Sequence, residues 1–310
     1  MISIYLCSCN GVRFIKEQLK SIFEQTISPD EVIISDDFSS DGTYEVVQSF
    51  IEQNKLKDSW CLIRNEPTLG YPRNFYEGIN RCKHEFIFFA DQDDIWEPTK
   101  LEIMAGQMEN SVNINLLACC YDAIDENGDK IHSIMIPRVH TKIEKIRKVN
   151  LENVLYRFRW VGMGMVVRKS WALEHINRIA STTIPHDFLF AILASLTESF
   201  YETCFIGVHH RRHNNNIAKE EHRIAKLINK DRLLRELNDY VQMLKEVYKV
   251  IPDVFEKEKL LISQKEVQLL KRQKYVETKD IKGCLVHACM DLRSTRFFSV
   301  IRDILVMHQS

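Results

Sequence analysis

The stretch FIFFADQDDIWEPTKL, residues 86–101, decides the fold of this chain. The apolar run Glu85–Ala90 is typical of a buried strand, and it ends directly in three carboxylates within four residues. A helix is then expected over Pro98–Asn110. Acids beside a buried strand are costly unless a cation compensates them. The stretch therefore favours a site for a divalent metal and phosphate over a helix N-terminus with solvated acids.

The rest of residues 1–123 repeats the alternation of apolar runs with amphipathic stretches. The expected strands are Ser3–Cys9, Glu31–Ser35, Trp60–Ile63 and Asn115–Tyr121, and the expected helices are Phe14–Glu24, Thr43–Asn54 and Pro72–Cys82. This alternation predicts an α/β fold with a mostly parallel sheet between two layers of helices. In such sheets ligands bind at the carboxyl ends of the strands.

The second half of the chain is less regular before it becomes helical. We expect a strand over Arg159–Arg168, a helix over Asp187–Leu196, a last strand over Tyr201–Gly207 and a polar loop over His209–Asn216. From Ala218 onward the pattern is helical, with Pro252 between two helices. The organisation expected is a ligand-binding α/β domain over 1–216 and a C-terminal helical region over 217–310.

Composition and charge limit the classes of protein. Of the 310 residues, 45% are hydrophobic and 27% charged, which supports a packed core. No apolar run reaches the roughly 18 residues of a membrane span, and the N-terminus lacks the features of a signal peptide. Nine cysteines without a CxxC pair suit a reducing cytoplasm. Residues 211–310 carry 21 Lys and Arg against 14 Asp and Glu. This excess indicates either a solvated helical face or contact with an anionic membrane.

Several common nucleotide and nucleophile motifs are absent from the sequence. It contains no GxGxxG, no GxxxxGK[ST] and no GxSxG. Their absence counts against nicotinamide dehydrogenases, P-loop enzymes and α/β-hydrolases.

An ordered set of motifs resembles glycosyltransferase family 2, whose members have the nucleotide-sugar-binding GT-A fold. The matching stretches are CSCNGVRFIKEQLKSIFEQT (7–26), DEVIISDDFSSDGT (30–43), LGYPRNFYEGI (69–79), the stretch 86–101, IPHDFLFAILA (184–194) and HHRRHNNN (209–216). They follow the family's order over roughly residues 1–216. Within the family, the chain is most similar to rhamnosyltransferase-like bacterial polysaccharide enzymes. The resemblance implies an inverting, metal-dependent transfer of a sugar from a nucleotide-diphosphate donor.

The resemblance assigns the nucleotide to the first strand tips. Contacts from Cys7, Cys9 and Asn10 would be made by the backbone, because the family's usual aromatic residue is missing from this loop. Asp37 corresponds to the acid that contacts the base or ribose; a turn-forming role is the alternative for it, and Asp36 could take that role instead. Arg73 is either a nucleotide contact or a surface arginine.

The resemblance assigns the diphosphate and its metal to the fourth strand tip and a later loop. Asp93 corresponds to the metal-binding acid of the DxD signature, for Mn²⁺ or Mg²⁺. Asp91 would contact the ribose or reach the metal through water, and Gln92 would bind the donor beside it. Arg211 would fold over the diphosphate and His213 would bind the metal, although the neighbouring histidines leave this last assignment open. A polar surface loop is the alternative.

The resemblance makes Asp187 the general base, because His186-Asp187 lies where the family has an acidic pair. A plain helix N-cap is the alternative for Asp187. The expected partners are a UDP- or dTDP-sugar and a saccharide or lipid-linked acceptor used in cell-surface polysaccharide synthesis, with no nucleic acid. The expected location is the cytoplasm, with peripheral contact of the C-terminal helices with the inner membrane face as one alternative. A silent nucleotide-sugar-binding protein and a metal-dependent phosphotransferase are the competing functions.

Overall fold

The computed structural model describes residues 1–131, 146–176, 183–213, 229–290 and 297–308. The chain divides into two compact units. The first comprises Met1–Asn150 and Arg159–Asn214, and the second comprises Leu151–Phe158 and Asn215–Ser310. The expected boundary at residue 216 lies outside the described residues. The segment Leu151–Phe158 belongs to the second unit, and its apolar side chains Leu151, Val154 and Leu155 are buried.

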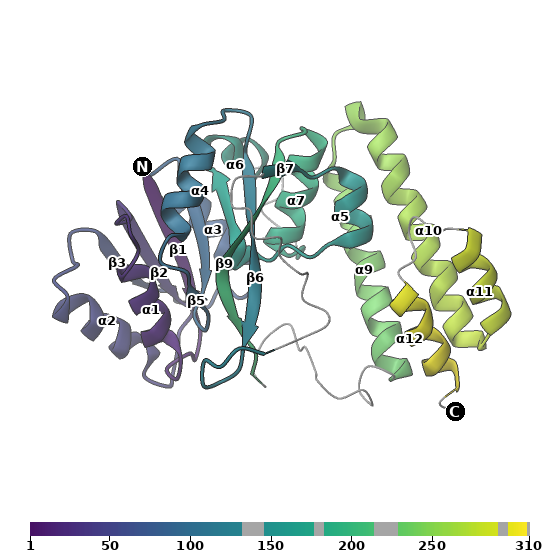
Figure 1. The fold of residues 1–310 in the computed structure, drawn as a ribbon, viewed down its shortest axis with the longest axis horizontal. Coiled ribbons are helices and arrows are strands. Elements are labelled where there is room, and N and C mark those ends of the chain that lie inside the picture. The colour runs from purple at the N-terminus through teal and green to yellow at the C-terminus, as the bar shows by residue number, and fades with distance from the viewer. Residues whose placement is uncertain (132–145, 177–182, 214–228, 291–296, 309–310) are drawn as a thin grey trace. The chain divides into compact units, whose positions relative to one another are not determined.

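Within the described residues of the first unit, nine strands form one sheet in the order β3-β2-β1-β4-β8-β6-β9-β5, with β7 paired to β9 (Figure 1). The strands are β1 Ile2–Ser8, β2 Glu31–Asp36, β3 Trp60–Arg64, β4 Phe86–Asp91, β5 Ile95–Trp96, β6 Leu116–Ile124, β7 Ile146–Lys148, β8 Met165–Arg168 and β9 Phe200–Arg211. The helices are α1 Ile15–Phe23, α2 Thr43–Gln53, α3 Arg73–Arg81, α4 Lys100–Glu109, α6 Lys169–Ile176 and α7 His186–Leu196, with the short turn η1 Gly162–Gly164.

Strand direction brings the predicted polar tips to one edge of the sheet. β3, β2, β1 and β4 are mutually parallel, β8 runs against both β4 and β6, and β6 is parallel to β9. The carboxyl ends of β1, β2, β3, β4, β6 and β9 therefore share one edge, which also holds η1 at the start of β8. The predicted mixed, mostly parallel sheet is confirmed.

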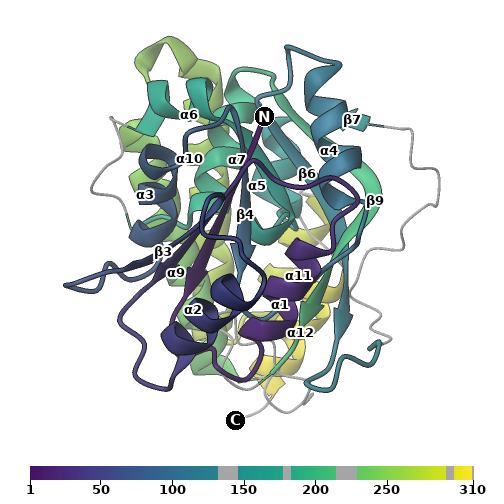
Figure 2. The same cartoon turned by 90° about the vertical axis from the view of Figure 1, so that its left-hand side faces the viewer.

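Side chains of successive strand residues point to opposite faces, and each face is covered by helices (Figure 2). Ile4 and Leu6 of β1 belong to the core with α1, α2 and α4. Tyr5 points the other way, toward α3, where a Cβ on Gly78 would come 2.6 Å from its ring. On this second face Phe89 stacks with Phe190 of α7. The expected layers of helices on both faces are thus present.

Two predicted elements differ from those in the structure. The last strand, β9, continues through Arg211 instead of ending at Gly207, because its pairing with β6 extends to Ile124. The segment 159–168 is a strand only from Met165, since η1 forms before it. The polar residues 209–211 are consequently held by the sheet instead of lying in a loop, and residues 214–216 lie outside the described residues.

The second unit consists of helices in its described residues. They are α5 Leu151–Arg157, α9 Lys230–Val250, the turn η2 Asp253–Phe255, α10 Glu256–Thr278, α11 Ile281–Met290 and α12 Phe297–His308. The predicted break at Pro252 is confirmed, because α9 ends before it and α10 begins after it. Arg272 of α10 forms a two-fold ion pair with the buried Asp303 of α12. In the part of the chain that the structure describes, no helix has the length and apolar character needed to span a bilayer.

Candidate functional site

The acids at the strand tips lie within electrostatic reach of one another. Asp91 ends β4 opposite Cys7 of β1. Burial raises the pKa of Asp91 well above its ordinary value, and the charges of Asp94, Asp93 and Asp187 raise it further. Burial also raises the pKa of the Cys7 thiol, with further contributions from Asp91 and Asp37. The structure therefore gathers the predicted acids from β2, β4 and α7 at a single edge of the sheet.

Two histidines, one near the end of β9 and one just after the strand, lie against these acids. His213 Nε2 lies 2.8 Å from Asp93 Oδ2. His210 Nδ1 lies 3.0 Å from Asp94 Oδ1. Burial opposes the protonation of His210, but Asp94, Asp93 and Asp91 raise its pKa to about 9 overall. His210 is therefore a cation at neutral pH, and His213 is the histidine that faces the predicted metal-binding acid.

Asp93 and His213 form a donor set that suits a divalent cation. Their facing atoms are a carboxylate oxygen and an imidazole nitrogen, a combination compatible with Mn²⁺. The described residues contain no group of three or more His, Cys, Asp or Glu side chains placed to hold a metal. The two side chains fit an ion whose other ligands are substrate phosphates and water, which is how Mg²⁺ and Mn²⁺ are commonly held.

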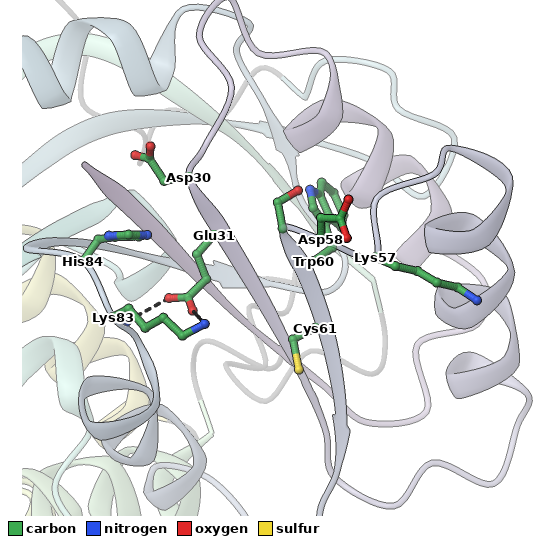
Figure 3. A pocket seen from close by; sticks show the side chains of 9 residues that line it. Asp30, Glu31, Lys57, Asp58, Trp60, Cys61, Lys83 and His84 are labelled. Atoms are coloured by element: carbon green, nitrogen blue, oxygen red, sulfur yellow. Dashed lines mark hydrogen bonds and ion pairs between the residues drawn. The ribbon is translucent and has the colours of Figure 1, made fainter.

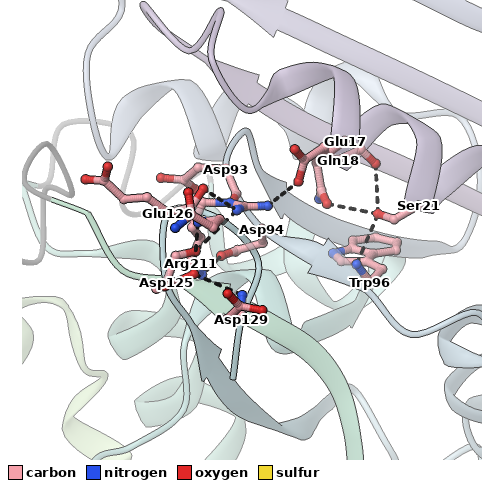
Figure 4. A network of polar contacts seen from close by, with 11 residues as sticks. Glu17, Gln18, Ser21, Asp93, Asp94, Trp96, Asp125, Glu126, Asp129 and Arg211 are labelled. Carbon is pink, nitrogen blue, oxygen red and sulfur yellow. Dashed lines mark hydrogen bonds and ion pairs between the residues drawn. The ribbon is translucent and has the colours of Figure 1, made fainter. Parts of the chain in front are cut away.

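Arg211 holds the acidic loop in place from within the protein (Figure 4). Its side chain is completely buried. It donates to the backbone carbonyls of Asp93 at 2.9 Å and Glu126 at 3.0 Å, and it forms an ion pair with Glu17 of α1. The guanidinium also lies 4.8 Å from the Phe14 ring centroid. These contacts favour a positioning role for Arg211 over the predicted direct contact with the donor, because the side chain is buried and each guanidinium nitrogen already has a partner.

Asp187 lies at the beginning of α7, and burial raises its pKa to about 6. Hydrogen bonds from the backbone amides of Phe188 and Gly162 limit this rise. The Phe188 amide donates to Asp187 Oδ1 over 2.7 Å. The N-cap of α7 is Pro185, so the interpretation of Asp187 as a plain N-cap is wrong. A carboxyl with this pKa is suited to accepting a proton near neutral pH.

His186 precedes Asp187 at the position where the resemblance expects an acid, and its imidazole is neutral. Its ring stacks on Phe75 with centroids 4.1 Å apart, and burial lowers its pKa to about 3. Neither ring nitrogen has a hydrogen-bond partner among the described residues. Asp187 therefore titrates without a second acid directly beside it in the chain.

The two acids at the end of β2, Asp36 and Asp37, have different contacts. Asp36 is fully buried and accepts hydrogen bonds from the Ser39 amide and hydroxyl and from the Ser8 hydroxyl, which is the turn-forming role anticipated for it. Asp37 is 8% exposed and accepts from the amides of Leu69 and Gly70 at 2.7 and 2.8 Å. Asp37 thus ties the loop before α3 to the tip of β2.

The first loop is held by its neighbours through backbone groups. Gln92 accepts from the Cys9 amide at 2.8 Å and donates to the Cys9 carbonyl at 3.0 Å. A Cβ on Gly11 would approach the Gln92 side chain to 2.1 Å, so a larger residue there would displace Gln92. The side-chain oxygen of Asn10 accepts a hydrogen bond from the Ser40 amide. These contacts fix the loop, while the predicted contacts of Cys7, Cys9, Asn10 and Gln92 with a nucleotide sugar stay predictions.

Two basic residues, Arg73 and Lys100, differ in their access to solvent. Arg73 is the first residue of α3 and is exposed, so a ligand can reach it from solvent. Lys100 was not anticipated: it is fully buried beside the acidic loop, with its Nζ 2.6 Å from the Met163 carbonyl oxygen. The sequence gives no signal for it, because a lysine in the first turn of a helix is ordinarily exposed.

The two cavities described in the first unit lie away from these acids. One has a volume of about 190 Å³ and is lined by residues that begin or precede β2, β3 and β4, including Glu31, Trp60 and Lys83 (Figure 3). The other, about 310 Å³, lies against α2 and β3. The first cavity is at the amino edge of the sheet, opposite the acids, so it does not belong to the candidate site.

The chain is similar in sequence to curated proteins. A UDP-Gal:alpha-D-GlcNAc-diphosphoundecaprenol beta-1,3-galactosyltransferase of Escherichia coli is 31% identical over 119 residues, which are 38% of this chain and 42% of that protein. The chain thus matches less than half the length of that curated relative.

Two solved structures share the fold. S. aureus TarS 1-349 in complex with UDP-GlcNAc has a TM-score of 0.59 and 14% identity, covering 100% of this chain and 90% of that one. The mannosyltransferase PcManGT from Pyrobaculum calidifontis, in complex with GDP-Man and Mn²⁺, has a TM-score of 0.54 and 12% identity, covering 99% and 84%. The predicted GT-A fold is confirmed by these likenesses.

A sequence model of a known family also matches this chain. This model, described as Glycosyl transferase family 2, matches residues 3–172, more than half of the chain. The chain belongs to glycosyltransferase family 2.

Proposed function

We propose that this chain transfers a sugar, with inversion, from a UDP- or dTDP-linked donor to a hydroxyl of a saccharide or lipid-linked acceptor in cell-surface polysaccharide synthesis. The observation that carries the proposal is the position and pKa of Asp187. Its carboxyl has a pKa of about 6 and lies within electrostatic reach of Asp91 at the carboxyl edge of the sheet. The E. coli relative, whose name specifies a diphosphoundecaprenol-linked acceptor, supports the acceptor class.

Asp187 acts as the general base of a single displacement. Its carboxylate takes the proton of the acceptor hydroxyl while the hydroxyl oxygen forms a bond to the anomeric carbon. The bond between that carbon and the diphosphate oxygen breaks on the opposite face, and the diphosphate leaves with the bonding electron pair. Because the entering and leaving oxygens are on opposite faces, the anomeric configuration is inverted.

Asp93 and His213 would hold Mn²⁺ or Mg²⁺ together with the donor diphosphate. When bound, such an ion supplies positive charge that stabilises the diphosphate as a leaving group. Asp91, Gln92 and Arg73 would contact the donor around it. His210, a cation at neutral pH, keeps Asp94 paired and so limits the negative charge that the diphosphate meets.

The nucleotide would occupy the tips of β1 and β2. Asp37 lies there between the first loop and the segment before α3, with both carboxylate oxygens held by backbone amides. Cys7, Cys9 and Asn10 would bind through backbone groups, since no aromatic side chain is present at those positions. Because the Cys9 amide already donates to Gln92, Cys9 would contribute its carbonyl oxygen.

A donor-panel assay with Mn²⁺ tests the proposal. Purified full-length protein is incubated with UDP- and dTDP-sugars, with and without a lipid-linked acceptor, and both donor binding and transfer are measured. Asp187→Asn should bind donor and lose transfer, and the matched control Asp58→Asn, an exposed acid at the amino edge of the sheet, should keep both. Binding without transfer in wild type across the panel would identify a silent nucleotide-sugar-binding protein instead. Release of phosphate from monoesters would identify a phosphotransferase.

We also propose that the second unit contacts the inner membrane face, where a lipid-linked acceptor would lie. The exposed side of α10 carries Leu260 and Val267 together with Lys257, Lys271 and Lys274. Apolar side chains flanked by lysines suit the surface of an anionic bilayer. Flotation of the full chain with phosphatidylglycerol vesicles should exceed flotation with phosphatidylcholine vesicles, and Leu260→Glu with Val267→Glu should abolish the difference. Equal flotation of this double variant and wild type would contradict membrane contact.

A further inference from the structure

Lys100 occupies a position that is unfavourable for a lysine. Its side chain is fully buried at the start of α4. Nζ donates to the Met163 carbonyl oxygen over 2.6 Å and lies 3.3 Å from the centroid of the Trp96 ring. Burial lowers the pKa of Lys100 to about 7, against the opposing influence of Cys119, Asp94 and Asp91. Burying an amine costs free energy, so contacts around Lys100 must offset this cost.

The Met163 carbonyl belongs to the turn η1, which lies directly against the general base. The amide of Gly162 faces the Asp187 carboxylate and lowers its pKa. A Cβ on Gly162 would come 2.3 Å from Nε2 of His186, so the turn and the first residue of α7 are in close contact. Lys100 and α7 therefore hold the same three-residue turn from two sides.

The Lys100 amine connects the loop of acids to this turn. Trp96 follows the acids by two residues, its backbone amide is held by Ser21, and its ring supports the Lys100 amine. The amine then reaches η1 through the Met163 carbonyl. A displacement of the turn by a fraction of an ångström would move the Gly162 amide relative to the Asp187 carboxylate.

We propose that Lys100 is a positioning residue for the general base: its hydrogen bond to the Met163 carbonyl fixes the turn Gly162–Gly164, and the turn fixes the orientation of Asp187. The proposal rests on the proposed function for its catalytic consequence. Its structural consequence, the rigidity of the turn, does not depend on any activity.

The test compares Lys100→Met with wild type in the full-length protein. Methionine keeps an unbranched stem and removes the donor. Hydrogen exchange of the Gly164 amide, which donates to the Val161 carbonyl at 2.9 Å, should become about tenfold faster. The kcat for sugar transfer should fall by about 10²-fold, with the KM for the donor unchanged within about twofold. The control Lys83→Met, at an exposed lysine on the amino edge of the sheet, should change neither quantity.

The outcomes separate the two proposals. Unchanged exchange at Gly164, or an unchanged kcat in an active enzyme, overturns the role of Lys100. An equal loss of kcat and donor affinity overturns it as well, because Lys100 would then support the whole site. If wild type transfers no sugar, the proposed function fails while the exchange result still decides whether Lys100 holds the turn. If Lys100→Met does not fold, Trp96→Phe reduces the ring beneath the amine and should change exchange and kcat in the same directions.

Discussion

Replacing Asp187 with asparagine should lower activity and relieve an electrostatic cost of folding at the same time. Folding raises the pKa of the half-buried carboxyl from 3.8 to about 6. An acid whose pKa is raised by folding destabilises the folded protein when it is ionised, so its cost is present above pH 6 and is relieved as the pH falls toward 4. Asparagine has a similar shape and cannot ionise, so it does not carry this cost.

The magnitude follows from the pKa shift. Two pKa units correspond to about 3 kcal/mol at most, and partial access of water to the carboxyl reduces this to about 1–2 kcal/mol. The variant should therefore gain stability relative to wild type at pH 7.5. This difference should narrow by about 1 kcal/mol between pH 7 and pH 5, because wild type becomes protonated over that range. Comparing urea unfolding of both proteins at each pH isolates the contribution of Asp187 from that of other titrating groups.

As the pH falls from 7 to 5, the activity of the wild-type enzyme should decrease while its stability relative to the variant increases. A carboxyl with a pKa of about 6 is about 90% ionised at pH 7 and about 10% ionised at pH 5, so kcat/KM of wild type should fall about tenfold over this range. Asp187→Asn should lower kcat by about 10²–10⁴-fold and lose this acidic limb. Transfer by the variant at the wild-type rate, or a wild-type profile that is flat between pH 5 and 7, would refute the assignment of the base.

Three further perturbations test other parts of the site. Asp93→Ala should lose the Mn²⁺-dependent part of donor binding measured by calorimetry, because it removes the carboxylate that faces His213 at 2.8 Å; binding that is equally strong in EDTA would argue against this role. Arg211→Met should lower the free energy of unfolding by about 2–4 kcal/mol in urea titrations, since it leaves the half-buried carbonyls of Asp93 and Glu126 without their donor; a loss below 1 kcal/mol would contradict its positioning role. Phe38 has a φ of 62°, a left-handed backbone that costs about 1–2 kcal/mol for residues other than glycine. Phe38→Gly should therefore be more stable than Phe38→Ala by about 0.5–1 kcal/mol. The reverse order of stability in the same titrations would show that the backbone at this position is relaxed.

Much of the fold follows from local patterns. Alternating apolar runs and amphipathic stretches predict α1 to α4 and β1 to β4 to within two or three residues at either end, because periodicity depends only on neighbouring residues. The end of β9 did not follow from such a pattern. Polar residues from His209 to Arg211 indicate a loop when considered alone, and it is their pairing with β6 that keeps them in the sheet.

The sequence alone shows that acids lie at the end of the buried strand Phe86–Asp91 and at the start of the apolar helix α7, since these are properties of adjacent residues. Only the tertiary structure decided which partners these acids have. His213 faces Asp93 across 120 positions of the chain, and Lys100 reaches the turn beside Asp187 across 63. Burial also depends on the tertiary structure. It raises the pKa of Asp187 to about 6, and it places the Arg211 side chain inside the protein. Charge and solvent access depend on distance in space, and sequence spacing does not determine that distance once the chain has folded.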